Sequence, residues 1–170
     1  MIVTFLDFDG VLVTGKWMQA THQMILNSEL NHSDRTDQYG FRFDEAAMQN
    51  LRALHDRTNC VFVVSSTWRR SGYAEMKNLW RDRNMPGMLY DVTPIINNAP
   101  RGTEIRQWLL DNGYYTAIEG KDLIKIQNYL IIDDDMNMLI EQADHFIKCD
   151  FHHGLTEQHV TEAIDIISQG

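Results

Sequence analysis

Five short apolar runs recur along the chain, and they constrain the fold more than any other feature of the sequence. The first run, residues 2–6 (IVTFL), is rich in β-branched and aromatic residues and almost wholly apolar. That composition is typical of a strand that is covered on both faces of a parallel sheet. The same pattern returns at residues 60–64, 88–92, 129–132 and 145–149. The sequence therefore predicts a core of five buried strands.

Segments with helical spacing separate these runs. Asp44 can cap a helix that places Ala47, Leu51 and Leu54 on one face. Further helices are predicted at residues 71–83, 103–112, 136–143 (with Asp135 as the capping residue) and after Thr156. Strands that alternate with helices form βαβ units. The predicted fold class is α/β, a Rossmann-like three-layer α/β/α arrangement around a mainly parallel five-stranded sheet.

Residues 13–43 interrupt the alternation directly after the first strand. They carry many polar residues and show no clear period, so they are interpreted as a small insert that is too short for a core of its own. The chain has three prolines and no Gly/Ser-rich linker or internal repeat. We expect residues 1–170 to form a single domain.

Charge and hydropathy narrow the classes of partner. The chain has 15 Lys and Arg against 24 Asp and Glu, and the net charge of −9 argues against strong nonspecific adhesion to nucleic acid. No apolar run approaches the ~20 residues that span a bilayer, and the first residues lack the features of a signal peptide. We expect a soluble cytoplasmic protein with no membrane contact and no obligate protein partner.

Polar side chains follow three of the five runs. Asp7 and Asp9 come after the first, Ser and Thr residues at 65–67 after the second, and three aspartates at 133–135 after the fourth. Ligands of open α/β sheets bind beyond the carboxyl ends of the strands, so these side chains are expected to converge. Converging carboxylates repel one another unless a cation binds among them, and hard oxygen ligands suit Mg²⁺. The sequence therefore predicts a magnesium site.

The pair Asp7 and Asp9 suits phosphoryl transfer. Where a strand ends, the chain can turn so that two alternate carboxylates flank one substrate, one to attack and one to handle the proton. A carboxylate can attack phosphorus when a metal neutralises the phosphate and a hydrogen-bond donor steadies the transferring oxygens. Ser65 can supply such a donor, and a Lys or Arg would complete the set.

Three motifs carry a family resemblance. The segment DFDGV at 7–11 resembles the first motif of the haloacid dehalogenase (HAD) superfamily. The segment VFVVS at 61–65 resembles the second motif, and LIIDD at 130–134 resembles the acidic fourth motif. They stand in the family's order, each at the end of a predicted strand, and with the strand before the first motif they span residues 3 to 134.

The resemblance implies a mechanism for individual residues. Asp7 would form an aspartyl-phosphate, and Asp9 would protonate the leaving group and then activate water. Ser65 would bind the phosphoryl oxygens. Mg²⁺ would be held by Asp7, the backbone carbonyl of Asp9, and Asp133 or Asp134. The presence of Asp9 favours a phosphatase over a dehalogenase or an ATP-driven transporter.

The basic residue of the family's third motif has two candidates, Arg101 and Lys121. The segment STWR at 66–69, followed by RGTEIRQWL at 101–109, resembles the phosphatase-like domains found in RNA-repair proteins, and GLT at 154–156 fits the same subgroup. That resemblance favours Arg101, whereas Lys121 lies nearer to the fourth motif. Both remain candidates for phosphate binding.

The small insert resembles the minimal caps of family members that act on bulky substrates. The first interpretation is therefore a polynucleotide 3′-phosphatase, with Trp68 stacking on a base and Arg69 contacting phosphate. Ser66 can either contact the phosphate or cap the following helix. A mononucleotide phosphatase is the alternative enzyme, and a non-catalytic binding or regulatory protein is the alternative of another class.

Overall fold

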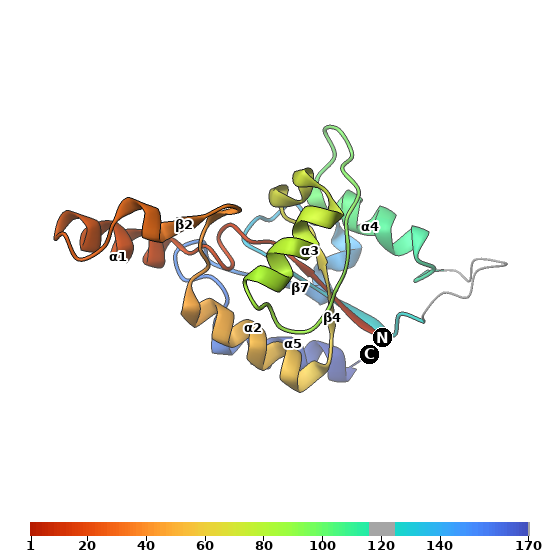
Figure 1. Ribbon diagram of the computed structural model, residues 1–170. Coiled ribbons are helices and arrows are strands. Elements are labelled where there is room, and N and C mark those ends of the chain that lie inside the picture. Colours follow the sequence, from red (N-terminus) through yellow and green to blue (C-terminus); the bar gives the residue numbers. More distant parts are fainter. Residues whose placement is uncertain (116–124, 170) are drawn as a thin grey trace.

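A five-stranded parallel sheet forms the centre of the computed structural model, which describes residues 1–115 and 125–169 (Figure 1). In spatial order the strands are β5 (Leu89–Val92), β4 (Val61–Val64), β1 (Ile2–Leu6), β6 (Asn128–Asp133) and β7 (Phe146–Lys148). All four strand pairings are parallel, which confirms the predicted sheet. Every strand bound lies within one residue of the bound that the apolar runs predict.

Helices cover both faces of this sheet. On one face, a single apolar cluster contains side chains of the three helices α2 (Glu45–Thr58), α3 (Tyr73–Asp82) and α5 (Glu157–Gln169). On the other, α4 (Arg101–Asp111) packs in a second cluster. Successive side chains of β1 alternate between the two, since Phe5 belongs to the cluster of α4 and Leu6 to the other. The predicted three layers are confirmed.

The helix bounds reflect local capping. The Asp44 side chain accepts a hydrogen bond from the backbone N–H of Ala46, as predicted for the start of α2. At its end, Asn59 adopts a left-handed conformation with φ of 51°, a common way to terminate a helix. Among the described residues, no helix has the length and apolar character that crossing a membrane requires.

The prediction of a helix at residues 136–143 is wrong. The structure has an irregular loop followed by a 3₁₀ helix, η3 (Ile140–His145). Asp135 does not cap a helix, because its carboxylate accepts hydrogen bonds from Met136 and Asn137 in a tight local turn. The apolar residues that suggested a helical face are exposed, Met136 by 66% and Ile140 by 94%.

The insert at residues 13–43 has more regular structure than its sequence predicts. It contains α1 (Gly15–Leu26), η1 (His32–Arg35) and a short antiparallel hairpin of β2 (Thr36–Asp37) and β3 (Gly40–Phe41). Figure 1 shows α1 projecting from the body of the molecule. Only Thr21 of this helix is buried, so it lacks the apolar face by which a helix is recognised in a sequence.

Polar contacts with Asp82 and Arg83 fix the hairpin of the insert to the body. Arg83, at the end of α3, forms an ion pair with Asp37 in which Nη2 and Oδ1 are 2.7 Å apart. The Tyr39 hydroxyl donates a hydrogen bond to the carboxylate of Asp82. The hairpin lies next to the first polar motif, because Tyr39 and Phe41 line one cavity with Asp9.

Gly102 allows α4 to begin against the loop that follows β6. Its N–H donates to the carbonyl of Asn137, and its own carbonyl accepts a hydrogen bond from Gln142. A Cβ at residue 102 would lie 2.5 Å from the backbone nitrogen of Leu139. The close contact therefore depends on glycine.

We expect Gly102→Ala to lower the free energy of unfolding by about 1–3 kcal/mol, because the added methyl group separates two backbone segments. The gain in helix propensity, about 1 kcal/mol, opposes this loss without cancelling it. Urea unfolding followed by circular dichroism measures the change. Arg106→Ala, on the exposed face of the same helix, is the control and should stay within about 0.5 kcal/mol. A Gly102→Ala protein as stable as the native one would contradict the packing argument.

Candidate active site

Three carboxylates meet where β1 and β6 end. Leu6 is paired with Ile132 in register, and the N–H of Asp7 donates to the carbonyl of Ile132, so Asp7 and Asp133 leave the sheet side by side. Oxygen atoms of Asp7, Asp133 and Asp134 all lie within 4.8 Å of one another. Asp7 and Asp133 are buried, whereas Asp134 is half-buried. The convergence predicted from the strand ends is therefore present.

Gly10 makes room for this cluster. Its φ of 69° lies in the left-handed region, and a Cβ at this position would be 2.2 Å from Oδ2 of Asp134. The residue after Asp9 must therefore lack a side chain for Asp134 to approach.

The cluster carries more negative charge than its surroundings balance. Burial and the neighbouring Asp7 carboxylate raise the pKa of Asp133 to about 7. The same two causes raise the pKa of Asp134. Arg101 offers partial compensation, with Nε 3.7 Å from Oδ2 of Asp133 and Nη2 4.0 Å from Oδ2 of Asp7.

The donor set fits a hard divalent cation. All three side chains present carboxylate oxygens, the ligands that Mg²⁺ prefers. In the part of the chain that the structure describes, the buried Oδ2 of Asp133 has no hydrogen-bond donor. A buried oxygen of this kind normally has a partner, and a metal ion would provide one.

Ser65 stands on the opposite side of Asp7 from β6. Its N–H donates to the carbonyl of Leu6, which fixes the end of β4 beside the end of β1. Its hydroxyl is buried and has no hydrogen-bond partner within the described ranges. Ser66 has a different role, because its hydroxyl accepts a hydrogen bond from the N–H of Trp68 and caps the 3₁₀ helix η2 (Thr67–Ser71). The capping interpretation of Ser66 is therefore the one that its contacts support.

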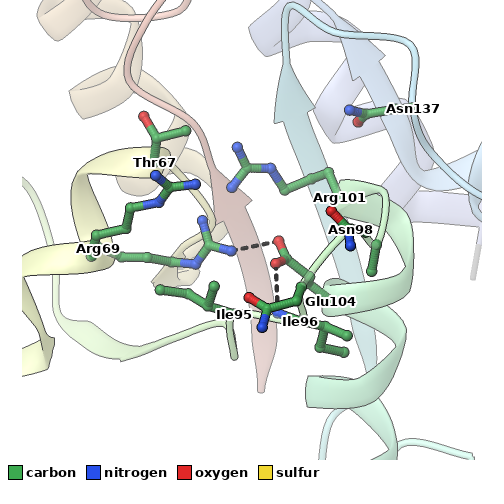
Figure 2. Close-up of a pocket in the computed structure, with 11 residues that line it drawn as sticks. Thr67, Arg69, Ile95, Ile96, Asn98, Arg101, Glu104 and Asn137 are labelled. Carbon is green, nitrogen blue, oxygen red and sulfur yellow. Dashed lines mark hydrogen bonds and ion pairs between the residues drawn. The ribbon is translucent and has the colours of Figure 1, made fainter.

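Arg101 is the basic residue that the structure places at the cluster. It is the first residue of α4, and its side chain extends from that helix toward η2 (Figure 2). Its Nη1 is buried without a hydrogen-bond partner in residues 1–115 and 125–169. A phosphoryl oxygen could accept from that nitrogen. The other candidate, Lys121, lies outside the described residues.

Arg69 does not have the free guanidinium that the predicted contact with substrate requires. The side chain is buried, and only 5% of the residue is exposed. All three of its nitrogens donate to backbone carbonyls at the ends of β4 and β5, those of Ser65, Ser66, Thr93 and Pro94. The expectation of a phosphate contact is corrected to a structural role, because no guanidinium nitrogen is left free.

Glu104 completes the environment of Arg69. Its Oε2 lies 2.5 Å from Nη2 of Arg69, and its Oε1 accepts a hydrogen bond from the N–H of Ile96 (Figure 2). Glu104 stands one helical turn after Arg101 on α4. The buried pair therefore connects the serine loop, the end of β5 and the helix that carries Arg101.

Trp68 contacts the second aspartate of the first motif. Its indole N–H donates to Oδ2 of Asp9 at 3.0 Å, and its ring packs edge-on against Phe8. Desolvation and the Asp7 carboxylate raise the pKa of Asp9, while the hydrogen bond from Trp68 lowers it. Asp9 and Trp68 line a cavity of about 340 Å³ together with Tyr39 and Phe41 of the insert. The Asp9 side chain is thus held by Trp68 at the wall of this cavity.

Two residues at the site were not found from the sequence. Lys148 ends β7, and its Nζ donates to the backbone carbonyl of Asp134 at 3.2 Å. The strand-end rule that identified Asp7 could also have identified Lys148. No pattern in the sequence identifies Glu104, because its partner Arg69 is 35 residues away in the chain.

A comparison with family models identifies the group to which the chain is related. The model for the HAD domain in Swiss Army Knife RNA repair proteins matches residues 3–160. That range begins in β1 and includes the three-acid cluster, Ser65 and Arg101. No curated protein and no solved structure matches the chain. Because the match covers most of the sequence and the whole of the candidate site, the chain belongs to the HAD superfamily, in the family of HAD domains of Swiss Army Knife RNA repair proteins.

Proposed function

We propose that the protein is a magnesium-dependent phosphohydrolase that removes a terminal phosphate from a nucleic acid through an aspartyl-phosphate on Asp7. The observation that carries this proposal is the position of Asp7 between two kinds of neighbour. On one side are the carboxylates of Asp133 and Asp134. Near Asp7 are two donor groups that form no hydrogen bond to any described residue, the Ser65 hydroxyl and Nη1 of Arg101. Such donors suit the oxygens of a transferring phosphoryl group.

In the first step, a carboxylate oxygen of Asp7 attacks phosphorus, and the bond between phosphorus and the leaving oxygen breaks. Asp9 gives its proton to that oxygen. The raised pKa of Asp9 favours the protonated form that this step needs. Trp68 holds the Asp9 carboxylate through its indole N–H, and the cavity that these two residues line would take the leaving group.

In the second step, water attacks the phosphorus of the aspartyl-phosphate. Asp9, now ionised, accepts the proton of that water, and Asp7 is released as a carboxylate. Ser65 and Arg101 donate to the phosphoryl oxygens in both steps. A magnesium ion held by Asp7, Asp133, Asp134 and the backbone carbonyl of Asp9 would neutralise negative charge on the phosphate.

Two observations favour a polynucleotide end as the substrate. The family's model describes domains of RNA repair proteins, which favours a polynucleotide end. The cavity beside Asp9 has aromatic side chains from Trp68, Tyr39 and Phe41, on which a base could stack. A mononucleotide would use the same cavity, so a comparison of substrates separates the two enzymes.

We expect Asp7→Asn to abolish magnesium-dependent phosphate release from an aryl phosphate and from a 3′-phosphorylated oligonucleotide, by at least about a thousand-fold. The amide is close in shape to the carboxylate but cannot attack phosphorus. Asp135→Asn is the matched control, because Asp135 lies two residues from Asp133 but outside the three-acid cluster, and it should retain activity. If Asp7→Asn kept native turnover, or if the folded native protein released no phosphate, the proposed function would be wrong.

Asp9→Asn should separate the two chemical steps. With nitrophenyl phosphate the leaving group departs without a proton, so the first step can proceed, whereas hydrolysis of the aspartyl-phosphate is slowed by about 100- to 10,000-fold. Rapid-mixing measurements should therefore give a burst of nitrophenolate that approaches one equivalent per enzyme. Asp7→Asn should give no burst. Slow release without a burst in Asp9→Asn would contradict the assigned sequence of steps.

Magnesium should stabilise the folded protein by relieving repulsion in the cluster. At ten times the dissociation constant, the free energy of unfolding should rise by about 1.4 kcal/mol. Asp134→Asn should reduce this gain, and the half-buried position of Asp134 makes the substitution tolerable to the fold. Thermal unfolding with and without Mg²⁺ measures the effect, with Asp135→Asn as the control. An equal gain in Asp134→Asn would exclude Asp134 as a ligand.

A further inference from the structure

A second cavity, of about 330 Å³, lies beside Arg101, and Asp9 is not among its lining residues (Figure 2). It opens between η2 and the loop that joins β5 to α4. We call it the Arg70 cleft and define it by Thr67, Arg70, Asn97, Asn98, Arg101 and Asn137. Its volume lies within the usual range of small-molecule sites, about 300–1,000 Å³.

The cleft has an excess of positive charge although the chain as a whole is acidic. Glu104 is the only carboxylate among the lining residues, and both of its oxygens are engaged, by Arg69 and by the N–H of Ile96. The charge of Arg69 is thereby paired. Arg70 is exposed and has no ion pair or hydrogen bond to any of the described residues. The cleft therefore favours an anion.

A tight turn directs two amide side chains at the same cleft. The N–H of Ala99 donates to the carbonyl of Ile96, which closes a turn with Asn97 and Asn98 at its centre. Asn98 has a φ of 60°, a left-handed conformation that asparagine tolerates better than most residues. Within the described ranges, neither amide forms a hydrogen bond to the protein. Both can donate to a ligand.

Arg101 lines the Arg70 cleft and also stands beside Asp7 and Asp133. An anion in the cleft would therefore be a near neighbour of the phosphoryl group at Asp7. Arginine recognises the oxygens of a phosphate with two parallel N–H groups, and asparagine amides add neutral donors. A phosphodiester presents two such oxygens and one charge.

We propose that the Arg70 cleft binds a second phosphate of the substrate, next to the terminal phosphate that Asp7 attacks. The inference rests on the proposed phosphohydrolase function and adds a recognition site to it. The ligand chemistry is a phosphate ester on the same nucleotide as the scissile group. Its source is either the adjoining phosphodiester of a polynucleotide or the 5′-phosphate of a nucleoside 3′,5′-bisphosphate.

Steady-state kinetics on four substrates test the proposal. The substrates are an aryl phosphate, a nucleoside 3′-monophosphate, a nucleoside 3′,5′-bisphosphate and a 3′-phosphorylated oligonucleotide. Arg70→Gln should raise KM about ten-fold for at least one of the two substrates that carry a second phosphate, and leave kcat unchanged. KM for the other two should not change. Asn98→Gly, which keeps the left-handed backbone but removes the amide, should act in the same direction.

Arg57→Gln is the matched control, because it removes one exposed arginine from α2, which packs on the face of the sheet opposite to α4. A second readout is the dependence of the oligonucleotide KM on salt, which should become shallower in Arg70→Gln and not in Arg57→Gln. A KM effect on the oligonucleotide but not the bisphosphate identifies the polynucleotide as the source, and equal effects identify any phosphate ester at the 5′ position of the same nucleotide.

Unchanged kinetics of Arg70→Gln and Asn98→Gly on all four substrates would overturn the inference while leaving the phosphohydrolase intact. If the native protein hydrolyses none of the four, the proposed function fails separately. In that case, equilibrium binding of the 3′-phosphorylated oligonucleotide to Asp7→Asn, with and without Arg70→Gln, tests whether the Arg70 cleft binds the substrate, because binding needs no turnover. Equal affinity of the single and the double variant would reject phosphate binding in the cleft, and about ten-fold weaker binding with Arg70→Gln would support it.

Discussion

Repulsion among Asp7, Asp133 and Asp134 is the constraint around which this protein is arranged. Parallel pairing of β1 with β6 forces the three carboxylates to one edge of the sheet, in surroundings that water reaches poorly. Two neighbouring residues make this close approach of carboxylates possible. Arg101 offsets part of the charge, and Gly10 leaves the space in which Asp134 can approach. An arrangement that costs folding energy and places acids in a strand-end pocket is typical of a catalytic or metal-binding site.

A second buried charge pair, Arg69 with Glu104, organises the other side of the site. The pair forms no hydrogen bond to a carboxylate of the cluster, yet it fixes the carbonyl of Ser65 and the start of the helix that carries Arg101. Removing one partner of a buried pair commonly costs about 3–5 kcal/mol, because the remaining charge has no counterpart. The positions of Ser65 and Arg101 are thus determined partly by a charge pair outside the three-acid cluster.

The sequence predicts the sheet and the acid cluster well because both depend on local patterns. A strand buried on two faces gives an apolar run, and the residues after parallel strands must share one edge. The loop after β6 was misread as a helix because Met136 and Ile140 have helical spacing but are exposed. Helix α1 was missed for the opposite reason, since it buries little. The role of Arg69 could not be predicted, because its partner Glu104 is brought to it only by tertiary packing.

The central position of β1 also affects how the molecule acquires its site. The amino group of Met1 hydrogen-bonds to the side chain of Gln127, 126 residues along the chain, where the pairing of β1 with β6 begins. Closing so large a loop is entropically unfavourable, and contacts between distant residues form slowly compared with helices and short turns. We expect the acid cluster to assemble late in folding, after helices such as α2 have formed locally. A fragment that lacks β6 would keep Asp7 and Ser65 but could not hold them as a site.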